Sequence, residues 1–403
     1  MSLSFYYISN GNMYRYSDGE SREIRSGVLD SYVRKVKDAA ERNEWKYNGT
    51  GAAFTGTYQQ RPTAENAVSS IYSRVNSLAE YNGELIYSID IDSTNGIYRK
   101  GEGDSEGIVL CSSSTAYRDL DIRGELMLTS AHFAGESNIA IMNIATKKFN
   151  TYTEGHTLDF SPVWSADGSP RVYFCSSGLP EGEERTPEQM HTPPSFSQIV
   201  TDMYSAASRA TRGPTAICRL DVMEGRLREI LADDAYDFTH PASTSDGSLY
   251  YIRKPYRQNN GGSGLLGCLT DIFMLPVRLF GALFGFLNVF SAKYSGKTLS
   301  RGDVKNRDSE KMFIDGNLIN AEKELENNRK RGDENPGIIP RSWELHRLAP
   351  DGSDTLIRGG VTAYRVDEQS GDILISNGSG ILRISPDGKE EKIISAEKVV
   401  YIK

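Results

Sequence analysis

A short strand-like motif recurs six times along this chain of 403 residues. Five copies read apolar-x-Arg-x and the sixth has asparagine instead of arginine; they begin at Met13, Ile97, Ile141, Ile217, Leu345 and Ile381. Most copies are followed by a polar turn, such as SPDG, and then by another strand-like run. Units of four short strands separated by turns are typical of β-propeller blades. The repeat predicts an all-β fold, a six-bladed β-propeller of four-stranded blades. Seven blades, with GTGAAFTGTYQ in a degenerate one, is the alternative count.

The two ends of the chain complement each other in this arrangement. Residues 4–26 supply only the second, third and fourth strands of a blade, whereas residues 398–403 read as a spare first strand. We expect these two segments to pair and to close residues 1–403 into a single propeller. Closure removes the open sheet edges at which separate chains could associate.

The turn after the first strand is also repeated. Pro162 and Pro241 each stand five residues before an aspartate-glycine pair. The run PVWSADG from Pro162 and the apolar-x-Arg-x strands resemble the TolB-type β-propeller family, whose blades are WD-repeat-like. The resemblance implies a protein that acts as an interaction platform. TolB itself works in the periplasm and has an extra N-terminal domain, and the start of this chain, MSLSFYYISNGN, resembles neither that domain nor an export signal.

Three segments do not fit the blade pattern: residues 27–66, 178–215 and 256–340. Loops between the second and third strands of a blade lie on the same face as the loops between blades, so we expect all three insertions on one face. Apolar stripes within residues 29–40 and 199–207 predict helices. We interpret these helices as a cap buried against the propeller or, alternatively, as docking elements for a partner.

The third insertion contains a strongly apolar run that predicts an amphipathic helix over residues 265–292. A membrane-spanning helix is disfavoured, because the chain must return to the same blade and Arg278 lies within the run. Three interpretations remain: a helix in the plane of a membrane surface, a helix packed on a partner or second copy through Gly281 and Gly285, and a helix buried within its own insertion. The candidate contact residues for a membrane or partner are Arg278, Leu279, Phe280, Leu283, Phe286, Leu287 and Phe290.

First strands line the axis of a propeller, and two of them share the sequence TAYR. Arg118 and Arg365 end these copies and are expected on opposite sides of the axis. Two facing guanidinium groups could bind an anionic ligand, with Tyr117, Tyr364 and His240 nearby. The alternative is that each arginine pairs with an acidic neighbour, Asp121 or Asp367. We interpret the arginines of the recurrent third strand as cross-strand partners.

Composition and motifs narrow the function. The net charge of -8 comes from interspersed charges, which argues against a general nucleic-acid binder. The four cysteines form no C-x-x-C pair and are interpreted as free thiols, although Cys175 and Cys218 are expected to face each other across a hairpin. Five histidines without H-x-x-x-H spacing predict no metal site, and no motif predicts a cofactor.

These observations predict a non-catalytic interaction scaffold with a protein partner. We expect it in the cytoplasm, held at a membrane surface or partner by residues 265–292; the periplasm applies if an export signal precedes the sequence. The rival prediction is a propeller that binds or hydrolyses a small anionic ligand in its axial channel, under the helical cap.

Overall fold

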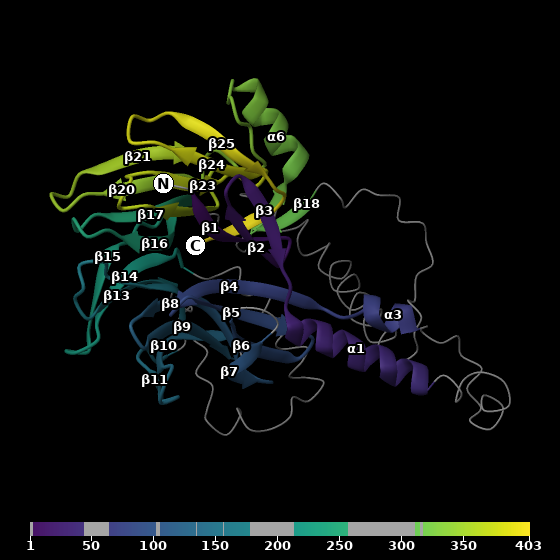
Figure 1. The fold of residues 1–403 in the computed structure, drawn as a ribbon. Coiled ribbons are helices and arrows are strands. Elements are labelled where there is room, and N and C mark those ends of the chain that lie inside the picture. Colours follow the sequence, from purple (N-terminus) through teal and green to yellow (C-terminus); the bar gives the residue numbers. More distant parts are fainter. Residues whose placement is uncertain are drawn as a thin grey trace, which may run out of the picture. The chain divides into compact units, whose positions relative to one another are not determined.

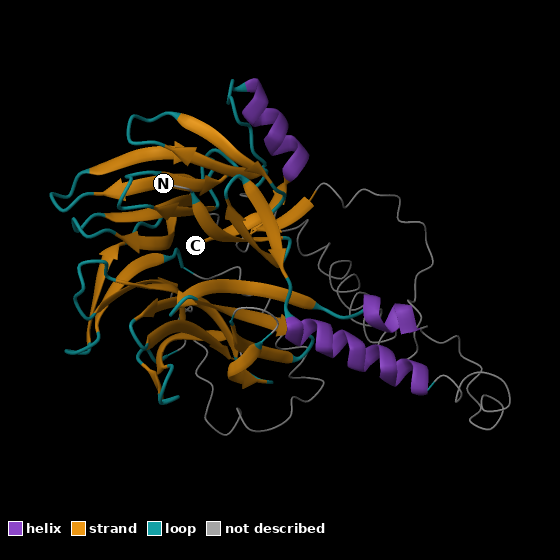
Figure 2. Ribbon diagram, in the orientation of Figure 1, coloured by secondary structure: helices purple, strands orange, loops and turns teal. Residues whose placement is uncertain are grey.

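β-Strands form most of the described part of the chain (Figure 2). The computed structural model describes residues 3–43, 64–101, 105–133, 135–155, 157–177, 213–256, 311–314 and 317–403. The chain divides into two units. The larger comprises residues 1–25, 73–258 and 310–403, and the smaller comprises residues 26–72 and 259–309.

The larger unit is built from four-stranded antiparallel meanders, most of whose strands are labelled in Figure 1. The first three contain β26 (Val399–Ile402), β1 (Ser4–Ser9), β2 (Asn12–Ser17) and β3 (Glu20–Ile24); β4 (Ser73–Tyr81), β5 (Glu84–Ile91), β6 (Thr94–Lys100) and β7 (Glu106–Ser112); and β8 (Ala116–Arg123), β9 (Leu126–Phe133), β10 (Glu136–Asn143) and β11 (Phe149–Thr151). The others contain β12 (Leu158–Trp164), β13 (Arg171–Ser177), β14 (Ala216–Asp221) and β15 (Arg226–Leu231); β16 (Tyr236–Ser243), β17 (Leu249–Pro255), β20 (Glu344–Leu348) and β21 (Asp354–Gly359); and β22 (Ala363–Val366), β23 (Ile373–Ser376), β24 (Gly380–Ile384) and β25 (Glu390–Ser395). A single parallel pair, Ser137 with Leu158, joins the meander of β8–β11 to that of β12–β15. This strand order is that of propeller blades.

The two ends of the chain lie in the same sheet (Figure 1). β26 pairs antiparallel with β1, so that Ile402 stands opposite Tyr7 and Tyr401 opposite Ile8. The amide of Tyr6 also donates to the carbonyl of Lys403 at 2.8 Å. The segments that the sequence predicts to pair are therefore hydrogen-bonded to each other.

Each meander packs against the next. β4 contacts β8, β8 contacts β12, β12 contacts β16, β22 contacts β26, and β1 contacts β4. The buried side chains lie between neighbouring sheets: Ile97 packs with Met127, and Leu128 packs with Phe174. Since a second strand is covered on both faces, it reads as a nearly continuous apolar run, as in the ILIS of β23, whereas the fourth strand β3 is polar and exposed.

The smaller unit contains two described helices, α1 (Gly27–Arg42) and α3 (Ala64–Ser69), which contact each other. Ser26 caps α1 by accepting a hydrogen bond from the amide of Leu29 at 3.1 Å. The predicted stripe at Leu29, Tyr32 and Val36 is half-buried, and most of the remaining positions of α1 are exposed. No helix in the described residues is long and apolar enough to cross a membrane.

Two predicted helices, within residues 199–207 and 265–292, lie outside the described residues. The end of the third insertion is described and belongs to the larger unit. It forms the hairpin of β18 (Lys311–Ile314) and β19 (Asn317–Asn320), followed by α6 (Ala321–Lys330). Ile314, Ile319 and Ile339 are buried in the core that β17, β20 and β22–β24 share, so this part of the insertion is built into the sheets.

The two cysteines that were expected to face each other do not. Cys175 stands opposite Ile217, and Cys218 stands opposite Phe174. Because successive side chains of a strand point to opposite faces, a shift of one residue places the two thiols on different faces of the sheet. Both are buried free thiols, and burial raises the pKa of Cys218 to about 11.

Candidate functional site

The first strands of neighbouring sheets share a bulge. In β8, β12 and β16 the pairing with the second strand shifts in the middle of the strand. Asp119, Ser161 and His240 lie within these bulges, with φ of 55°, 50° and 55°. Residues other than glycine rarely adopt this backbone, and a bulge redirects the side chains around it. Pro162 and Pro241 follow two of the bulged residues, where the missing amide proton costs no ladder bond.

Two aspartates of β8 connect this strand to the next sheet. Asp119 Oδ2 accepts hydrogen bonds from the amide of Ser161 at 3.0 Å and from Ser130 Oγ at 2.7 Å. Asp121 Oδ2 accepts from the amide of Trp164 at 2.9 Å. The first carboxylate satisfies an amide within the bulge of β12, and the second satisfies an amide just beyond it.

Arg118 lies beside this bulge and faces an acidic partner. Its Nη2 is 3.4 Å from Asp90 Oδ2; the Arg118 side chain is 42% exposed, and that of Asp90 is 8% exposed. The Nε of Arg118 is buried and has no hydrogen-bond partner among the described residues. Arg118 therefore pairs with Asp90, not with Asp121 as one of the two expectations had it.

His132 completes this group. Burial lowers the pKa of His132, and Arg118 lowers it further, against the opposing effects of Asp119 and Asp90. The imidazole is thus neutral at neutral pH. Its Nε2 lies 3.1 Å from Ser130 Oγ and 3.4 Å from Ser137 Oγ.

The geometry of Ser130, His132 and Asp119 is not that of a catalytic triad. In a triad the hydroxyl donates to the imidazole and the carboxylate accepts from the other ring nitrogen. Here Ser130 donates to Asp119, and Ser130 is fully buried. The Ser130 hydroxyl donates its hydrogen bond to the Asp119 carboxylate, and its burial keeps a substrate from reaching it.

The two TAYR copies do not occupy equivalent positions. Arg118 stands opposite Ser130, the fifth residue of β9, whereas Arg365 stands opposite Leu374, the second residue of β23. Arg365 donates from Nη1 to the carbonyl of Ser4 at 3.4 Å. The contacts found in the described residues thus place the two arginines in different surroundings, Arg118 beside β5 and Arg365 beside β1.

The other predicted residues also separate. Tyr364 donates from its hydroxyl to the carbonyl of His240 at 2.6 Å, and burial, together with Cys175, raises the pKa of Tyr364. Tyr117 instead packs edge-on against Phe149, with ring centroids 6.0 Å apart. The structure therefore brings Tyr364 and His240 together and places Tyr117 in the core between sheets.

Sequence reasoning missed two side chains near the C-terminus: Tyr401 in the closing strand β26, and Lys403, which follows it. Tyr401 donates to the carbonyl of Leu78 at 2.9 Å, and Lys403 Nζ lies 2.7 Å from Asp121 Oδ1. Burial alone would lower the pKa of Lys403, but the attraction of Asp121 raises it. The available signal was that VVYIK reads as a first strand, which places its polar side chains among those of β4 and β8.

The recurrent arginines of the third strands pair with nearby acids, which confirms three of them as structural partners. Arg99 Nε lies 3.1 Å from Glu84 Oε2, and Arg347 Nη2 lies 2.8 Å from Asp246 Oδ2. Arg383 Nε lies 3.6 Å from Asp372 Oδ2. Within the described ranges, no group of three or more histidine, cysteine or acidic side chains is arranged to hold a metal ion.

The comparisons with known proteins show likeness of structure only. No known family and no curated protein matches the sequence. TolB from Acinetobacter baumannii is similar with a TM-score of 0.48 and 9% identity, over 99% of this chain and 65% of that one. A putative TolB from Agrobacterium tumefaciens has a TM-score of 0.38 and 14% identity, over 64% of this chain and 67% of that one. A chain of the nidogen/laminin complex has a TM-score of 0.44 and 7% identity, over 99% and 97%. This chain thus spans less than two thirds of the first of these proteins.

Proposed function

We propose that the chain is a single six-bladed β-propeller that acts as a non-catalytic interaction scaffold. The strand order of each meander supports the blades, and the pairing of β26 with β1 supports closure of the ring. The succession of contacts from β4 through β8, β12 and β16 to β22 and back to β26 supports a closed circle; the step from β16 to β22 rests on the bond between His240 and Tyr364.

The observation that carries the proposal is the internal use of the polar groups on the first strands. Asp119 and Asp121 accept hydrogen bonds from β12, and Asp90 pairs with Arg118. Lys403 pairs with Asp121. Groups that already bond to one another stabilise the junctions between sheets and have little capacity left for chemistry on a substrate.

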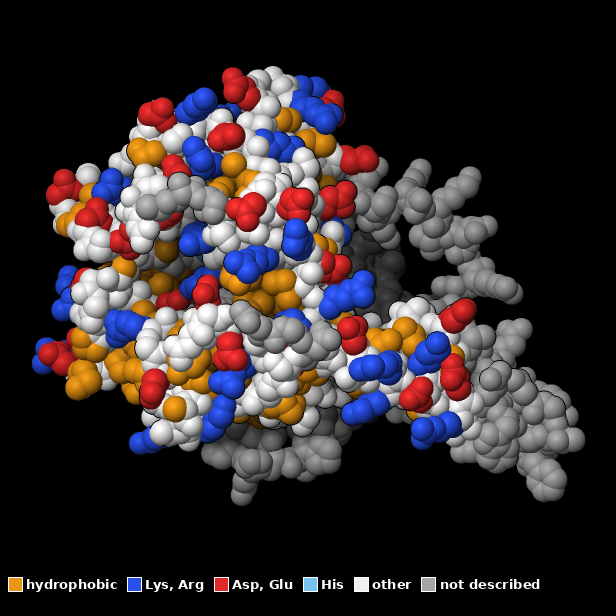
Figure 3. Space-filling view, in the orientation of Figure 1, with side chains coloured by type: hydrophobic (Ala, Val, Ile, Leu, Met, Phe, Trp, Pro, Cys, Tyr) orange, Lys and Arg blue, Asp and Glu red, His pale blue; other side chains and the backbone are white. Residues whose placement is uncertain are grey.

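An anionic ligand at this place has less support. Two cations lie at the bulge of β8, but Arg118 pairs with Asp90 and Lys403 pairs with Asp121, Asp119 adds a third carboxylate, and His132 is neutral. An anion would meet more negative than positive charge there. On the face shown in Figure 3, side chains of both signs are interspersed, so this face offers no broad basic surface for nucleic acid.

We place the interaction on the face of the insertions. The second insertion joins β13 to β14, the third joins β17 to β20, and residues 25–72 join β3 to β4. In up-and-down sheets these connections leave from the same ends of the strands, which supports a common face. The apolar arc of residues 265–292 is the proposed contact with a membrane surface or a protein partner.

Flotation of the purified protein with liposomes, beside light scattering, tests this contact. One variant changes Phe280, Phe286 and Phe290 to serine, and a matched control changes Asp271 and Asn288, on the other side of the predicted helix, to serine. Loss of flotation in the first variant alone supports a membrane contact; loss of self-association in that variant alone supports a partner contact. If neither property differs between the two variants, residues 265–292 are not the contact.

A further inference from the structure

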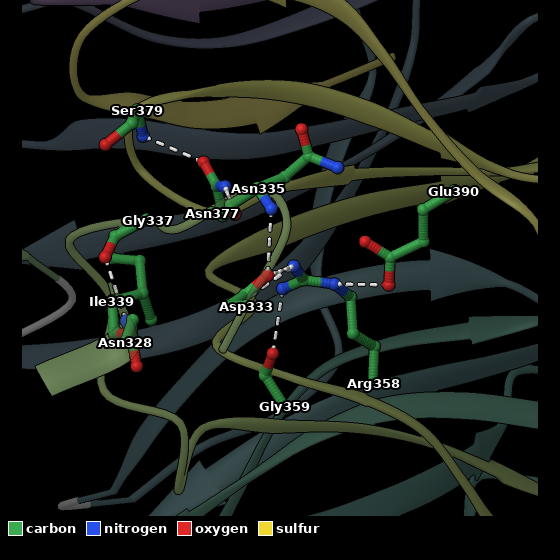
Figure 4. A network of polar contacts seen from close by, with 10 residues as sticks. All are labelled: Asn328, Asp333, Asn335, Gly337, Ile339, Arg358, Gly359, Asn377, Ser379 and Glu390. Carbon is green, nitrogen blue, oxygen red and sulfur yellow. Dashed lines mark hydrogen bonds and ion pairs between the residues drawn. The ribbon is translucent and has the colours of Figure 1, made fainter. Parts of the chain in front are cut away.

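The third insertion returns to the sheets through residues 328–340, here called the return segment (Figure 4). Asn328, near the end of α6, is 3% exposed. Its Nδ2 donates to the carbonyls of Gly337 at 2.8 Å and Ile339 at 3.0 Å. This side chain ties the helix to the segment that follows, so that α6 and the return segment form one piece.

The return segment bonds to the turn between β23 and β24. The amide of Ile338 donates to the carbonyl of Asn377 at 3.1 Å, and Asn377 Nδ2 donates to the carbonyl of Asn335 at 2.9 Å. Glycine is needed at the contact, since a Cβ on Gly337 would lie 2.2 Å from the carbonyl oxygen of Asn377. The two backbones are therefore in direct contact, without intervening side chains.

One arginine joins the return segment to two sheets (Figure 4). Arg358 lies on β21, and its side chain is 8% exposed. Its Nε donates to Glu390 Oε1 of β25 at 2.9 Å, and its Nη2 donates to Asp333 of the return segment at 3.3 Å. Its Nη1 donates to the carbonyl of Gly359 at 2.9 Å. A buried guanidinium needs such partners, and removing one of them leaves a charge that is costly to bury.

We propose that α6 and the return segment form a rigid mount, through which Arg358 ties the third insertion to two sheets, that of β16, β17, β20 and β21 and that of β22–β25. A force that a bound partner exerts on the insertion is then transmitted to the sheets of β21 and β25, through Asp333, Arg358 and Glu390. The mount itself rests on described contacts alone; only the transmission from a partner rests on the contact proposed above.

Hydrogen exchange followed by mass spectrometry on the full chain tests the mount. In the unmodified protein, peptides from residues 328–340 should exchange as slowly as those of β23 and β24. Asp333→Asn should accelerate exchange of residues 328–340 at least tenfold and leave peptides of β8–β10 unchanged. The control is Glu326→Gln, which removes an exposed pair with Lys330 on α6 and should change nothing.

Two results would overturn the mount. One is rapid exchange of residues 328–340 in the unmodified protein. The other is an Asp333→Asn variant whose exchange is unchanged, or accelerated uniformly over the whole larger unit. Arg358→Lys serves if the first variant folds poorly: it keeps the charge but loses the forked contact, and it should accelerate residues 328–340 together with β25. Liposome flotation is a separate readout, so failure of the membrane proposal leaves this test unaffected.

Discussion

At the scale of single residues, aspartates set the turns between strands. Asp246 accepts from Thr244 Oγ1 at 2.6 Å and from the amide of Ser248 at 2.9 Å, and these bonds lower its pKa to about 2. Asp167 accepts from both the hydroxyl and the amide of Ser169, and these bonds likewise lower its pKa to about 2. The recurrent Asp-Gly pairs of the sequence are thus turn signals with a defined hydrogen-bond function.

These aspartates predict a loss of stability in acid. Their folded pKa lies below the ordinary value of about 4, so their contribution is present above pH 4 and is lost as the pH falls toward 2. Asp246→Asn should lower the free energy of unfolding at pH 7 by about 1 kcal/mol or less, because the carboxylate is half exposed. Urea unfolding from pH 7 to pH 2.5 should show the difference shrinking in acid; a difference that is constant with pH would contradict the assignment.

At the scale of elements, the closing strand is the decisive one. Val399 and Ile402 of β26 are buried in a core with Phe5, Tyr7 and Leu374, whereas Val400 between them is half-buried. Their burial depends on the pairing of β26 with β1. An element of four residues therefore determines whether the sheet of β1–β3 has an open edge.

We expect Val399→Ala and Ile402→Ala each to lower the free energy of unfolding by about 2–4 kcal/mol, through lost burial and the cavities left behind. Val400→Ala is the matched control and should cost clearly less. Denaturant unfolding measures all three. Equal effects at the three positions would mean that β26 does not occupy this core in solution.

Sequence reasoning succeeds where strand type and order are at issue. The apolar-x-Arg-x motif identified the third strands, because apolar residues on both sides of a half-buried arginine suit a half-covered strand. It does not predict which side chains meet at the axis. The shared TAYR sequence predicts equivalent positions for Arg118 and Arg365, but the bulge in β8 and the short β22 give the two arginines different registers against their second strands. Repeated letters do not determine the register of a strand.

A polar helix is predicted near the end of the third insertion, within residues 315–332, and α6 lies there, but the burial of this part of the insertion was missed. In the run KMFIDGNLIN, apolar residues that include Ile314 and Ile319 flank Asp315-Gly316, which is a hairpin signal that went unused, whereas Ile339 stands apart and shares no period with them. Arg358 looked like any arginine of an outer strand, since only the fold brings Asp333 and Glu390 to it. Contacts between distant segments of this kind leave no local signal in a single sequence.

At the scale of the whole molecule, Arg118 and Arg365 should behave independently. They share no partner among the described residues, since Arg118 pairs with Asp90 and Arg365 bonds to the carbonyl of Ser4. The effects of Arg118→Met and Arg365→Met on unfolding free energy should add to within about 0.5 kcal/mol in the double variant. A coupling well above this would indicate that the two guanidinium groups act together, as facing anchors for an anion would.

The central claim is that the polar groups of the first strands stabilise a scaffold and are not reserved for a ligand. The most direct measurement is denaturant unfolding of Asp119→Ala beside Asp119→Asn, which retains an acceptor for Ser161. We predict that Asp119→Ala loses about 2 kcal/mol, because one hydrogen bond across the junction of β8 and β12 and one to Ser130 of β9 are lost, and that Asp119→Asn loses less. If Asp119→Ala is as stable as the unmodified protein or more so, the Asp119 carboxylate does not stabilise the junction and is retained for function. That result would contradict the scaffold proposal.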